Sequence, residues 1–159
     1  MRVSDILNKE RIKVNLISKS KPDVIKELVD LMGSSNSVLD NKKVLKSIIE
    51  REKTSSTGIG NGVAIPHGKC AGVKNMIGSL GIVKEGIPFD SIDGKPANIV
   101  FMLVAPVGPS GPHIKALSVV SRILNSNDTR KKLLNCSTPE EVASVLENEE
   151  KNIFNKSFY

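Results

Sequence analysis

The stretch Gly58-Ile59-Gly60-Asn61-Gly62-Val63-Ala64-Ile65-Pro66-His67-Gly68 places one of the two histidines of the chain on a backbone rich in glycine and stiffened by proline. Glycine lets backbone amides approach a ligand closely, and Pro66 fixes φ just before the histidine. The small and apolar residues 62–65 indicate a buried strand that ends beneath His67 and lifts the imidazole to its rim. We therefore expect an imidazole that is displayed for chemistry and can hold a dianionic group among those amides.

Hydrogen-bond donors precede this stretch, in the form of Arg51 and the hydroxyl tract Thr54-Ser55-Ser56-Thr57. A guanidinium and hydroxyls are donors that bind phosphate. Each feature also has a plainer interpretation, because a cation near a helix end favours the dipole, hydroxyls make turns, and a histidine in a glycine-rich turn is often a surface residue. The coincidence of the donors with His67 favours a phosphate site.

The second histidine, His113, follows Pro112 at a predicted helix start that continues to Leu124. Free backbone N–H groups and the positive end of the dipole disfavour a cation there, so we expect a neutral imidazole. Such a ring can donate one hydrogen bond to a phosphoryl oxygen. The alternative is a surface residue at a helix start.

The sequence lacks the motifs of nucleotide-binding, serine-hydrolase and zinc sites. Gly58, Gly60 and Gly62 satisfy neither the Walker nor the dinucleotide-binding spacing, and no GxSxG nucleophile motif occurs. Cys70 and Cys136 do not combine with the histidines into a zinc pattern, so we expect two small buried or half-buried thiols and no metal.

The composition indicates one ordinary globular domain. The chain has 159 residues, of which 39% are apolar and 25% charged, and no stretch is long enough to cross a membrane. The N-terminal residues 1–11 lack the apolar segment of a signal peptide, and two cysteines do not suggest a disulfide framework, so we expect a cytoplasmic protein without direct membrane insertion.

The net charge of +6 raises the possibility of nucleic-acid binding. The lysines are spread along the whole chain, often beside acids, and form no basic block. With no Trp, one Tyr and four Phe, the chain also offers little for base stacking. We interpret most lysines as solvated surface residues and expect no nucleic-acid partner.

Hydrophobic periodicity predicts an α/β layer sandwich in a single domain, residues 1–150, followed by a frayed C-terminal tail, residues 151–159. Strong turn signals occupy the segment 89–96, between two apolar strands. The expected strands are 12–16, 76–83 and 97–105. The expected helices are 22–31, about 40–52, about 112–124 and 139 to about 147.

The tract from Arg51 to Gly68 resembles the phosphorylation-site signature of the IIA domains of the fructose/mannitol class (type 2) of the bacterial phosphoenolpyruvate-dependent phosphotransferase system. Residues 112–117 and 121–124 resemble the second histidine helix of that family, and 89–96 its middle turn. The resemblance covers roughly residues 3 to 148. It implies an α/β sandwich with a mixed β-sheet flanked by helices on both faces.

The resemblance also implies roles for particular residues. His67 would be the phosphoryl acceptor, generally at Nε2, and His113 would stabilise the phosphohistidine by a hydrogen bond. Arg51 would supply positive charge. Thr57 and the glycine loop at Gly58, Gly60 and Gly62 would complete the phosphate pocket. No cofactor is expected.

Two functions are compatible with the resemblance. The first is a phosphotransferase component that accepts a phosphoryl group from an HPr-type phosphocarrier protein and passes it to a IIB component of a sugar transporter. The second is a regulator of the nitrogen-related branch, which binds target proteins according to its phosphorylation state. The expected partners are therefore HPr and either a IIB component or a regulatory target.

Overall fold

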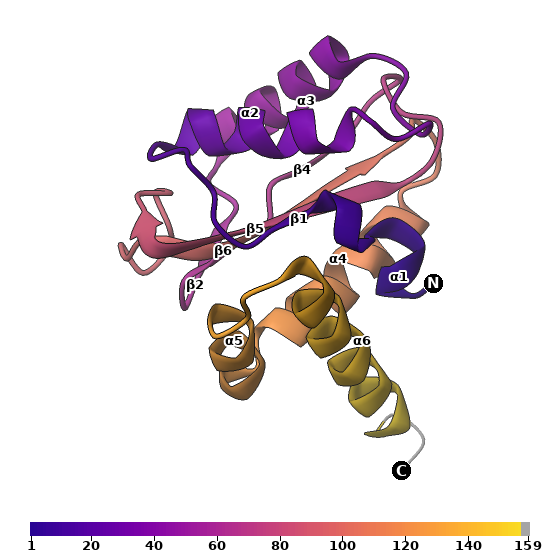
Figure 1. Ribbon diagram of the computed structural model, residues 1–159. Helices are drawn as coiled ribbons and strands as arrows, with labels where there is room; N and C mark the ends of the chain where they lie inside the picture. Colours follow the sequence, from indigo (N-terminus) through magenta and orange to yellow (C-terminus); the bar gives the residue numbers. More distant parts are fainter. Residues whose placement is uncertain (157–159) are drawn as a thin grey trace.

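The computed structural model describes residues 1–156, which form a mixed β-sheet between two layers of helices (Figure 1). The strand order is β1-β5-β6-β3-β2, and β4 also pairs with β6. β5 and β6 are antiparallel, whereas β1 is parallel to β5, and β3 and β4 are parallel to β6. The strands are β1 (Ile12–Lys13), β2 (Gly58–Gly60), β3 (Val63–Ala64), β4 (His67–Lys69), β5 (Ile77–Ile87) and β6 (Ala97–Ala105).

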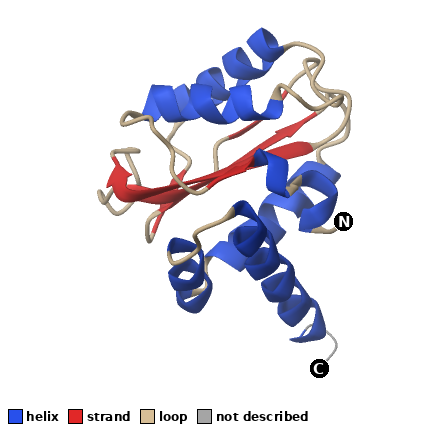
Figure 2. Cartoon of the chain, in the orientation of Figure 1, coloured by secondary structure: helices blue, strands red, loops and turns tan. Residues whose placement is uncertain are grey.

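Helices cover both faces of this sheet, as Figure 2 shows. On one face lie α2 (Lys21–Met32) and α3 (Asn41–Thr54). On the other lie α1 (Val3–Ile6), α4 (Gly111–Leu124), α5 (Asn127–Leu134) and α6 (Pro139–Lys156). A short 3-10 helix, Lys9–Arg11, leads into β1. The expectation of a mixed sheet with helices on both faces is confirmed.

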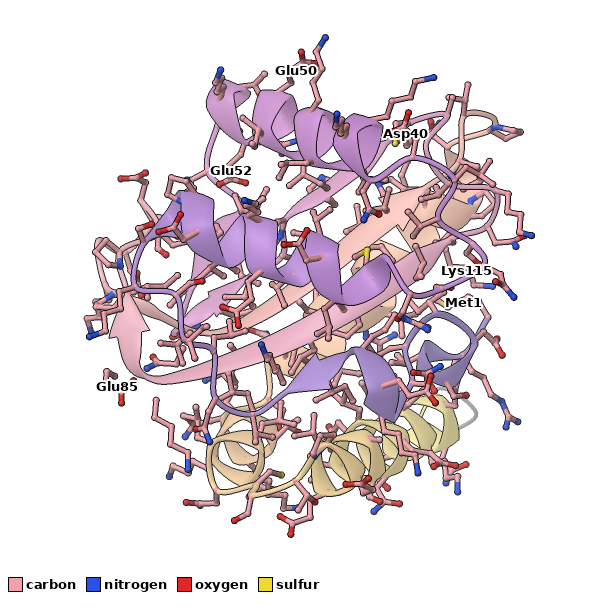
Figure 3. All side chains as sticks on the ribbon, turned by 45° about the horizontal axis from the view of Figure 1, so that its top comes forward. Met1, Asp40, Glu50, Glu52, Glu85 and Lys115 are labelled. Carbon is pink, nitrogen blue, oxygen red and sulfur yellow. The ribbon has the colours of Figure 1, made fainter. Side chains whose placement is uncertain are left out.

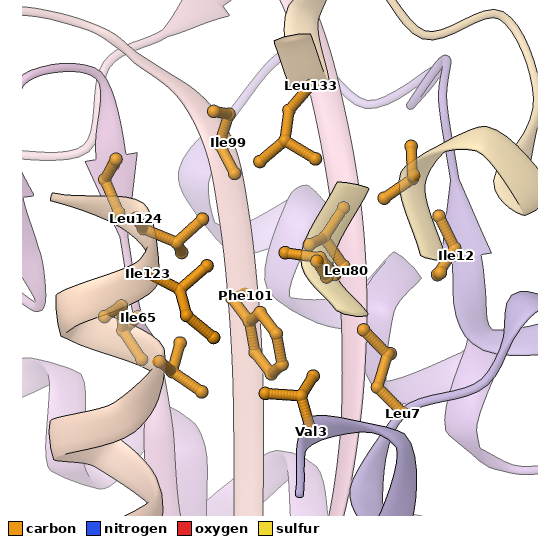
Figure 4. Close-up of a cluster of buried hydrophobic side chains, with 14 of the residues drawn as sticks. Val3, Leu7, Ile12, Ile65, Leu80, Ile99, Phe101, Ile123, Leu124 and Leu133 are labelled. Atoms are coloured by element: carbon orange, nitrogen blue, oxygen red, sulfur yellow. The ribbon is translucent and has the colours of Figure 1, made fainter. Parts of the chain in front are cut away.

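The central strand β6 is apolar from Ile99 to Ala105 because its side chains enter two cores. Phe101 and Leu103 face α4 and α6 in one hydrophobic cluster, whereas Met102 and Val104 face α2 and α3 in the other. Figure 4 shows the first cluster, where Phe101 lies among side chains from α1, α4 and β5. Burial on both faces explains why residues 99–105 show no polar alternation and yet form a strand.

Side-chain caps define where the helices over β5 and β6 begin. The Ser20 hydroxyl accepts a hydrogen bond from the Asp23 amide, and the Asp40 carboxylate accepts from the Lys42 and Lys43 amides. α2, α3 and α4 begin and end within about two residues of the predicted bounds. β5 is longer than predicted, and only Ile12 and Lys13 of the predicted strand 12–16 are in a strand.

The predicted C-terminal tail requires a correction. α6 continues from Pro139 to Lys156, so residues 151–156 are helical, and 157–159 lie outside the described part of the chain. The helix persists because α6 packs against α1 and the Glu150 carboxylate accepts a 2.7 Å hydrogen bond from the Val3 amide. Among the described helices, none has the length and apolar character needed to span a membrane.

Candidate active site

His67 is the first residue of β4 and lies beside Leu103 of β6. The ring is held from below, because its Nδ1 lies 2.8 Å from the carbonyl oxygen of Ile65. A carbonyl only accepts hydrogen bonds, so Nδ1 carries the hydrogen and Nε2 carries the lone pair. The expected strand end beneath the imidazole is thus observed, as β3 followed by the Ile65-Pro66 step.

His113 is the third residue of α4 and faces His67. The ring centroids of the two histidines are 5.6 Å apart, with the planes tilted by 50°. The His113 side chain is buried, and its Nδ1 has no hydrogen-bond partner among the described residues. The predicted helix start is confirmed, and the alternative of a surface residue is wrong.

Both histidines are held neutral by their surroundings. Burial lowers the pKa of His113 to about 4, helped by the positive charge that His67 and Lys69 can carry nearby. Burial also lowers the pKa of His67, as does Arg51, whereas the Ile65 carbonyl and Glu52 oppose the shift. Near neutral pH the pair therefore offers one nucleophilic nitrogen and one neutral neighbour that can donate a hydrogen bond.

An open pocket surrounds the two rings, and its wall is predominantly basic. Four cationic side chains line it against the single carboxylate of Glu50. The residues from α3 recur at helical spacing along one face of that helix, and the rest come from β4, the residue after it and α4. The lining residues are Lys43, Lys46, Ser47, Glu50, Arg51, His67, Gly68, Lys69, Cys70 and His113.

The contacts of Arg51 fit both interpretations that the sequence allowed, a cation at a helix end and a positive charge at the histidine site. Its Nη1 donates to the Ser55 carbonyl at 3.0 Å and to the Thr54 hydroxyl at 3.3 Å, which closes the C-terminal end of α3. The same side chain lines the pocket and lowers the pKa of His67 by its positive charge. The last turn of α3 therefore holds this cation at the edge of the histidine site.

Lys69 is a site residue that sequence reasoning missed. It lies two residues after His67 on β4, so the strand alternation places both side chains on the face that α4 covers. Its Nζ donates to the Gly108 carbonyl and, at 2.9 Å, to the Ser110 hydroxyl, which ties the loop before α4 to the strand. The alternation of His67 and Lys69 after a buried strand was the available signal.

The predicted phosphate-binding residues Thr57, Gly58, Gly60 and Gly62 do not line this pocket. Thr57 is buried, and both its amide and its hydroxyl donate to the Glu52 carboxylate. Gly60, the last residue of β2, has a φ of 92°, and Gly62, in the turn to β3, has a φ of 78°. Gly62 lies five residues before His67, roughly 16 Å along an extended chain.

The positive φ of Gly60 and Gly62 suits the β2–β3 hairpin, whereas Gly68 is the glycine that lines the pocket. A Cβ at Gly68 would lie 2.7 Å from the Ser47 hydroxyl oxygen, so glycine lets α3 approach β4 closely beside His67. Cys70 is half-buried at the pocket and Cys136 is buried, as expected for small thiols. Within residues 1–156 no group of three or more metal-ligating side chains is assembled.

The amino-acid sequence that builds this site matches a known protein family. Residues 5–149 match the family model described as "Phosphoenolpyruvate-dependent sugar phosphotransferase system, EIIA 2". The chain belongs to this IIA family. The predicted resemblance is thereby confirmed, and the two histidines lie inside the matched range.

The relatives of this IIA chain include fructose-specific components and a nitrogen regulatory protein. A fructose-specific EIIABC component of Bacillus subtilis is 37% identical over 95% of this chain, which spans only 24% of that protein. A fructose-specific EIIA component of Haloferax volcanii is 36% identical, over 84% of this chain and 90% of the relative. The crystal structure of the nitrogen regulatory protein IIA-Ntr from Neisseria meningitidis superposes with a TM-score of 0.84 at 35% identity, over 91% of this chain and 98% of that one.

Proposed function

We propose that this IIA protein is a phosphoryl carrier that accepts a phosphoryl group on Nε2 of His67 from the phosphohistidine of an HPr-type protein. It then passes the group to the IIB component of a fructose- or mannitol-type sugar transport system. The observation that carries the proposal is the hydrogen bond from His67 Nδ1 to the Ile65 carbonyl. This bond leaves Nε2 as the nucleophilic atom, on a ring that lines the basic pocket.

The proposed step exchanges one P–N bond for another. The Nε2 lone pair forms a bond to phosphorus as the P–N bond of the donor breaks, and the donor imidazole retains the electron pair of that bond. The hydrogen on Nδ1 stays where the Ile65 carbonyl holds it. Because the transition state resembles metaphosphate, catalysis consists of positioning and of charge stabilisation at the equatorial oxygens.

The surrounding residues supply that stabilisation. His113, neutral and 5.6 Å from His67 between ring centroids, is placed to donate a hydrogen bond to a phosphoryl oxygen. Arg51 and Lys69 add positive charge at the same pocket. The openness that two successive partner proteins need is provided by a site at the edge of the sheet, between α3 and the start of α4. The proposed step uses no metal and no nucleotide.

The assignment to sugar transport is supported by the fructose-specific relatives, including one of similar length. A second function, regulation by phosphorylation-dependent binding of target proteins, is supported by the likeness to IIA-Ntr of Neisseria meningitidis over nearly its whole chain. Both functions use the same phosphorylated histidine. They differ in the partner that recognises it.

The acceptor role is tested by incubating the protein with phosphorylated HPr and mapping the acid-labile phosphate to a peptide. We expect label on the peptide that contains His67 and none in His67→Ala. His113→Gln serves as the matched control, since it removes the other imidazole and should still take up label. Persistent labelling of His67→Ala would refute the proposal.

The sugar role is tested by adding the protein to membranes that carry the neighbouring IIB and IIC components, with HPr and the phosphoenolpyruvate-dependent first enzyme. Sugar phosphorylation that depends on His67 is the expected result. Failure with every neighbouring IIB, together with a pulled-down complex that forms in only one phosphorylation state, would assign the regulatory function instead.

A further inference from the structure

A buried carboxylate that the proposed transfer step does not use lies next to Arg51 in the sequence. Glu52, in the last turn of α3, is 9% exposed. In Figure 3 it lies between α2 and α3, whereas Glu50 projects from the outer side of the same helix. A carboxylate is rarely buried in this way unless it is paired, and its partners indicate what it holds.

Two hydrogen bonds connect Glu52 to the segment that follows α3. Oε1 accepts from the Thr57 amide at 2.8 Å, and Oε2 accepts from the Thr57 hydroxyl at 2.6 Å. Both oxygens of the carboxylate therefore engage one residue, which fixes Thr57 against the end of the helix. Bonds of this kind to an ionised acceptor are short and comparatively strong.

The chain of contacts continues from Thr57 to His67. The Thr57 carbonyl accepts a 3.0 Å hydrogen bond from the Ile65 amide, and the Ile65 carbonyl accepts the 2.8 Å bond from His67 Nδ1. Glu52 thus fixes Thr57, Thr57 fixes the Ile65 residue, and Ile65 fixes the tautomer and orientation of the imidazole. Every link is a hydrogen bond between atoms at normal distances.

Lys21 of α2 pairs with the Glu52 carboxylate and holds it in place. Its Nζ lies 2.8 Å from Glu52 Oε1, and the two side chains are 17% and 6% exposed. The same Nζ lies 4.8 Å from the centroid of the Phe89 ring and donates to the Phe89 carbonyl. A buried ion pair whose members are both hydrogen-bonded is an arrangement that persists, because loss of one partner would strand the other charge.

We infer that Glu52 is a positioning residue for His67, acting through Thr57 and Ile65, and that its negative charge stabilises the ring when Nε2 carries a phosphoryl group. This inference rests on the proposed phosphoryl transfer. The bond from Nε2 to phosphorus draws electrons from the ring, so the imidazole becomes more positive in the transition state and in the product. A fixed carboxylate nearby lowers the energy of that charge.

Glu52 acts against a set of opposing charges. Arg51, its neighbour on α3, lowers the pKa of His67 by its positive charge, and Lys69 on β4 lowers the pKa of His113 in the same way. The outer wall of the pocket adds Lys43, Lys46 and Glu50 from α3. Among these groups, Glu52 is the acid that raises the pKa of His67.

The test compares Glu52→Gln with the matched control Glu27→Gln. Glu27 lies on α2, is 12% exposed and pairs with Lys13 at 2.8 Å, beside β1 at the other edge of the sheet. The same substitution there removes a similar ion pair without touching the site. For each protein the rate of transfer from phosphorylated HPr, its KM, the pKa of His67 and the ¹⁵N shifts of its ring would be measured.

We expect Glu52→Gln to transfer phosphate about tenfold more slowly at an unchanged KM, with a lower pKa of His67, while Glu27→Gln matches the wild type. Equal rates and equal His67 pKa values in the two variants would overturn the inference, even if Glu52→Gln were less stable. Should Glu52→Gln fail to fold, Thr57→Val is the second variant. It keeps the Glu52 charge and a side chain of the same shape at 57 but removes the hydrogen bond from the Thr57 hydroxyl to Glu52. Slower transfer at unchanged KM in that variant supports the inference, and the wild-type rate overturns it.

Failure of the proposed function would be distinguishable from failure of this inference. If the wild type takes no phosphoryl group from HPr, the proposed function is wrong. The pKa and ring tautomer of His67 still test the role of Glu52 in that case. Values displaced in Glu52→Gln but not in Glu27→Gln support positioning, and unchanged values overturn it.

Discussion

Acidification should destabilise this protein through the burial of His113. The pKa of His113 is about 4 in the folded protein, against an ordinary value of 6.5. Above pH 6.5 the ring is neutral in both the folded and the unfolded state, so the free energy of unfolding is unaffected. Between pH 6.5 and 4 the unfolded chain binds a proton that the folded protein does not, and stability falls.

The size of the loss follows from the same two values. Each pKa unit corresponds to about 1.4 kcal/mol, so lowering the pH from 6.5 to 5 should cost roughly 2 kcal/mol of the free energy of unfolding. The full loss, reached near pH 4, is about 3 kcal/mol. Below that pH both states are protonated and His113 contributes no further change.

Urea unfolding at pH 7 and pH 5, followed by far-UV circular dichroism, would measure this loss. His113→Gln is the control, because it keeps a polar side chain of similar size and does not titrate. Groups far from the two histidines titrate alike in both proteins and cancel in the comparison. We expect the wild type to lose roughly 2 kcal/mol more than the variant over this range. An equal loss in the two proteins would refute the assignment of a buried neutral imidazole at 113.

Three further predictions test the site and the fold. His113→Ala should still accept a phosphoryl group but transfer it more slowly, because loss of one hydrogen bond to that group costs roughly 1 to 3 kcal/mol. Transfer rates equal to those of the wild type in both directions would contradict this. Phe101→Ala should lower the free energy of unfolding, measured by urea titration, by about 3 to 5 kcal/mol, because the ring is fully buried between β6 and the α4 layer. A loss below about 1 kcal/mol would count against that packing. Glu150→Ala should accelerate hydrogen exchange of the Val3 amide, the donor to the lost carboxylate, and an unchanged exchange rate would show that α1 does not depend on this contact.

The parts of the fold that the sequence predicted are those in which local and tertiary preferences coincide. The run 97–105, apolar except for Asn98, is buried on both faces from Ile99 onward and forms β6 over those residues. Asp40 caps α3 and Pro22 lies in the first turn of α2, so the starts of those two helices could be located from the sequence. α5 was missed because its surface is polar and its burial is confined to Thr129 and Leu133, which leaves little periodic signal.

The two histidines of the candidate site could be predicted from the sequence, whereas the places of the glycines and of Lys69 could not. His67 follows a buried strand and His113 a helix-start proline, so each position has a local signature, and the family resemblance joined them. The glycines at 60 and 62 could not be assigned from sequence, because a residue needed for positive φ and a residue needed for close approach of a ligand are both glycine. For Lys69 the only sequence signal is its alternation with His67, and its contacts with Gly108 and Ser110 require α4 to be folded beside β4.

The strands at the margins of the sheet limit how another protein can attach to this one. β1 has two residues, and β2 and β4 have three each, whereas the inner strands β5 and β6 have eleven and nine. A margin this short exposes too few unpaired backbone groups to serve as a template for an added strand. Recognition of the proposed phosphoryl donor and acceptor would therefore come from side-chain complementarity around the pocket. Its selectivity can change by surface substitution while the backbone of the sheet stays the same.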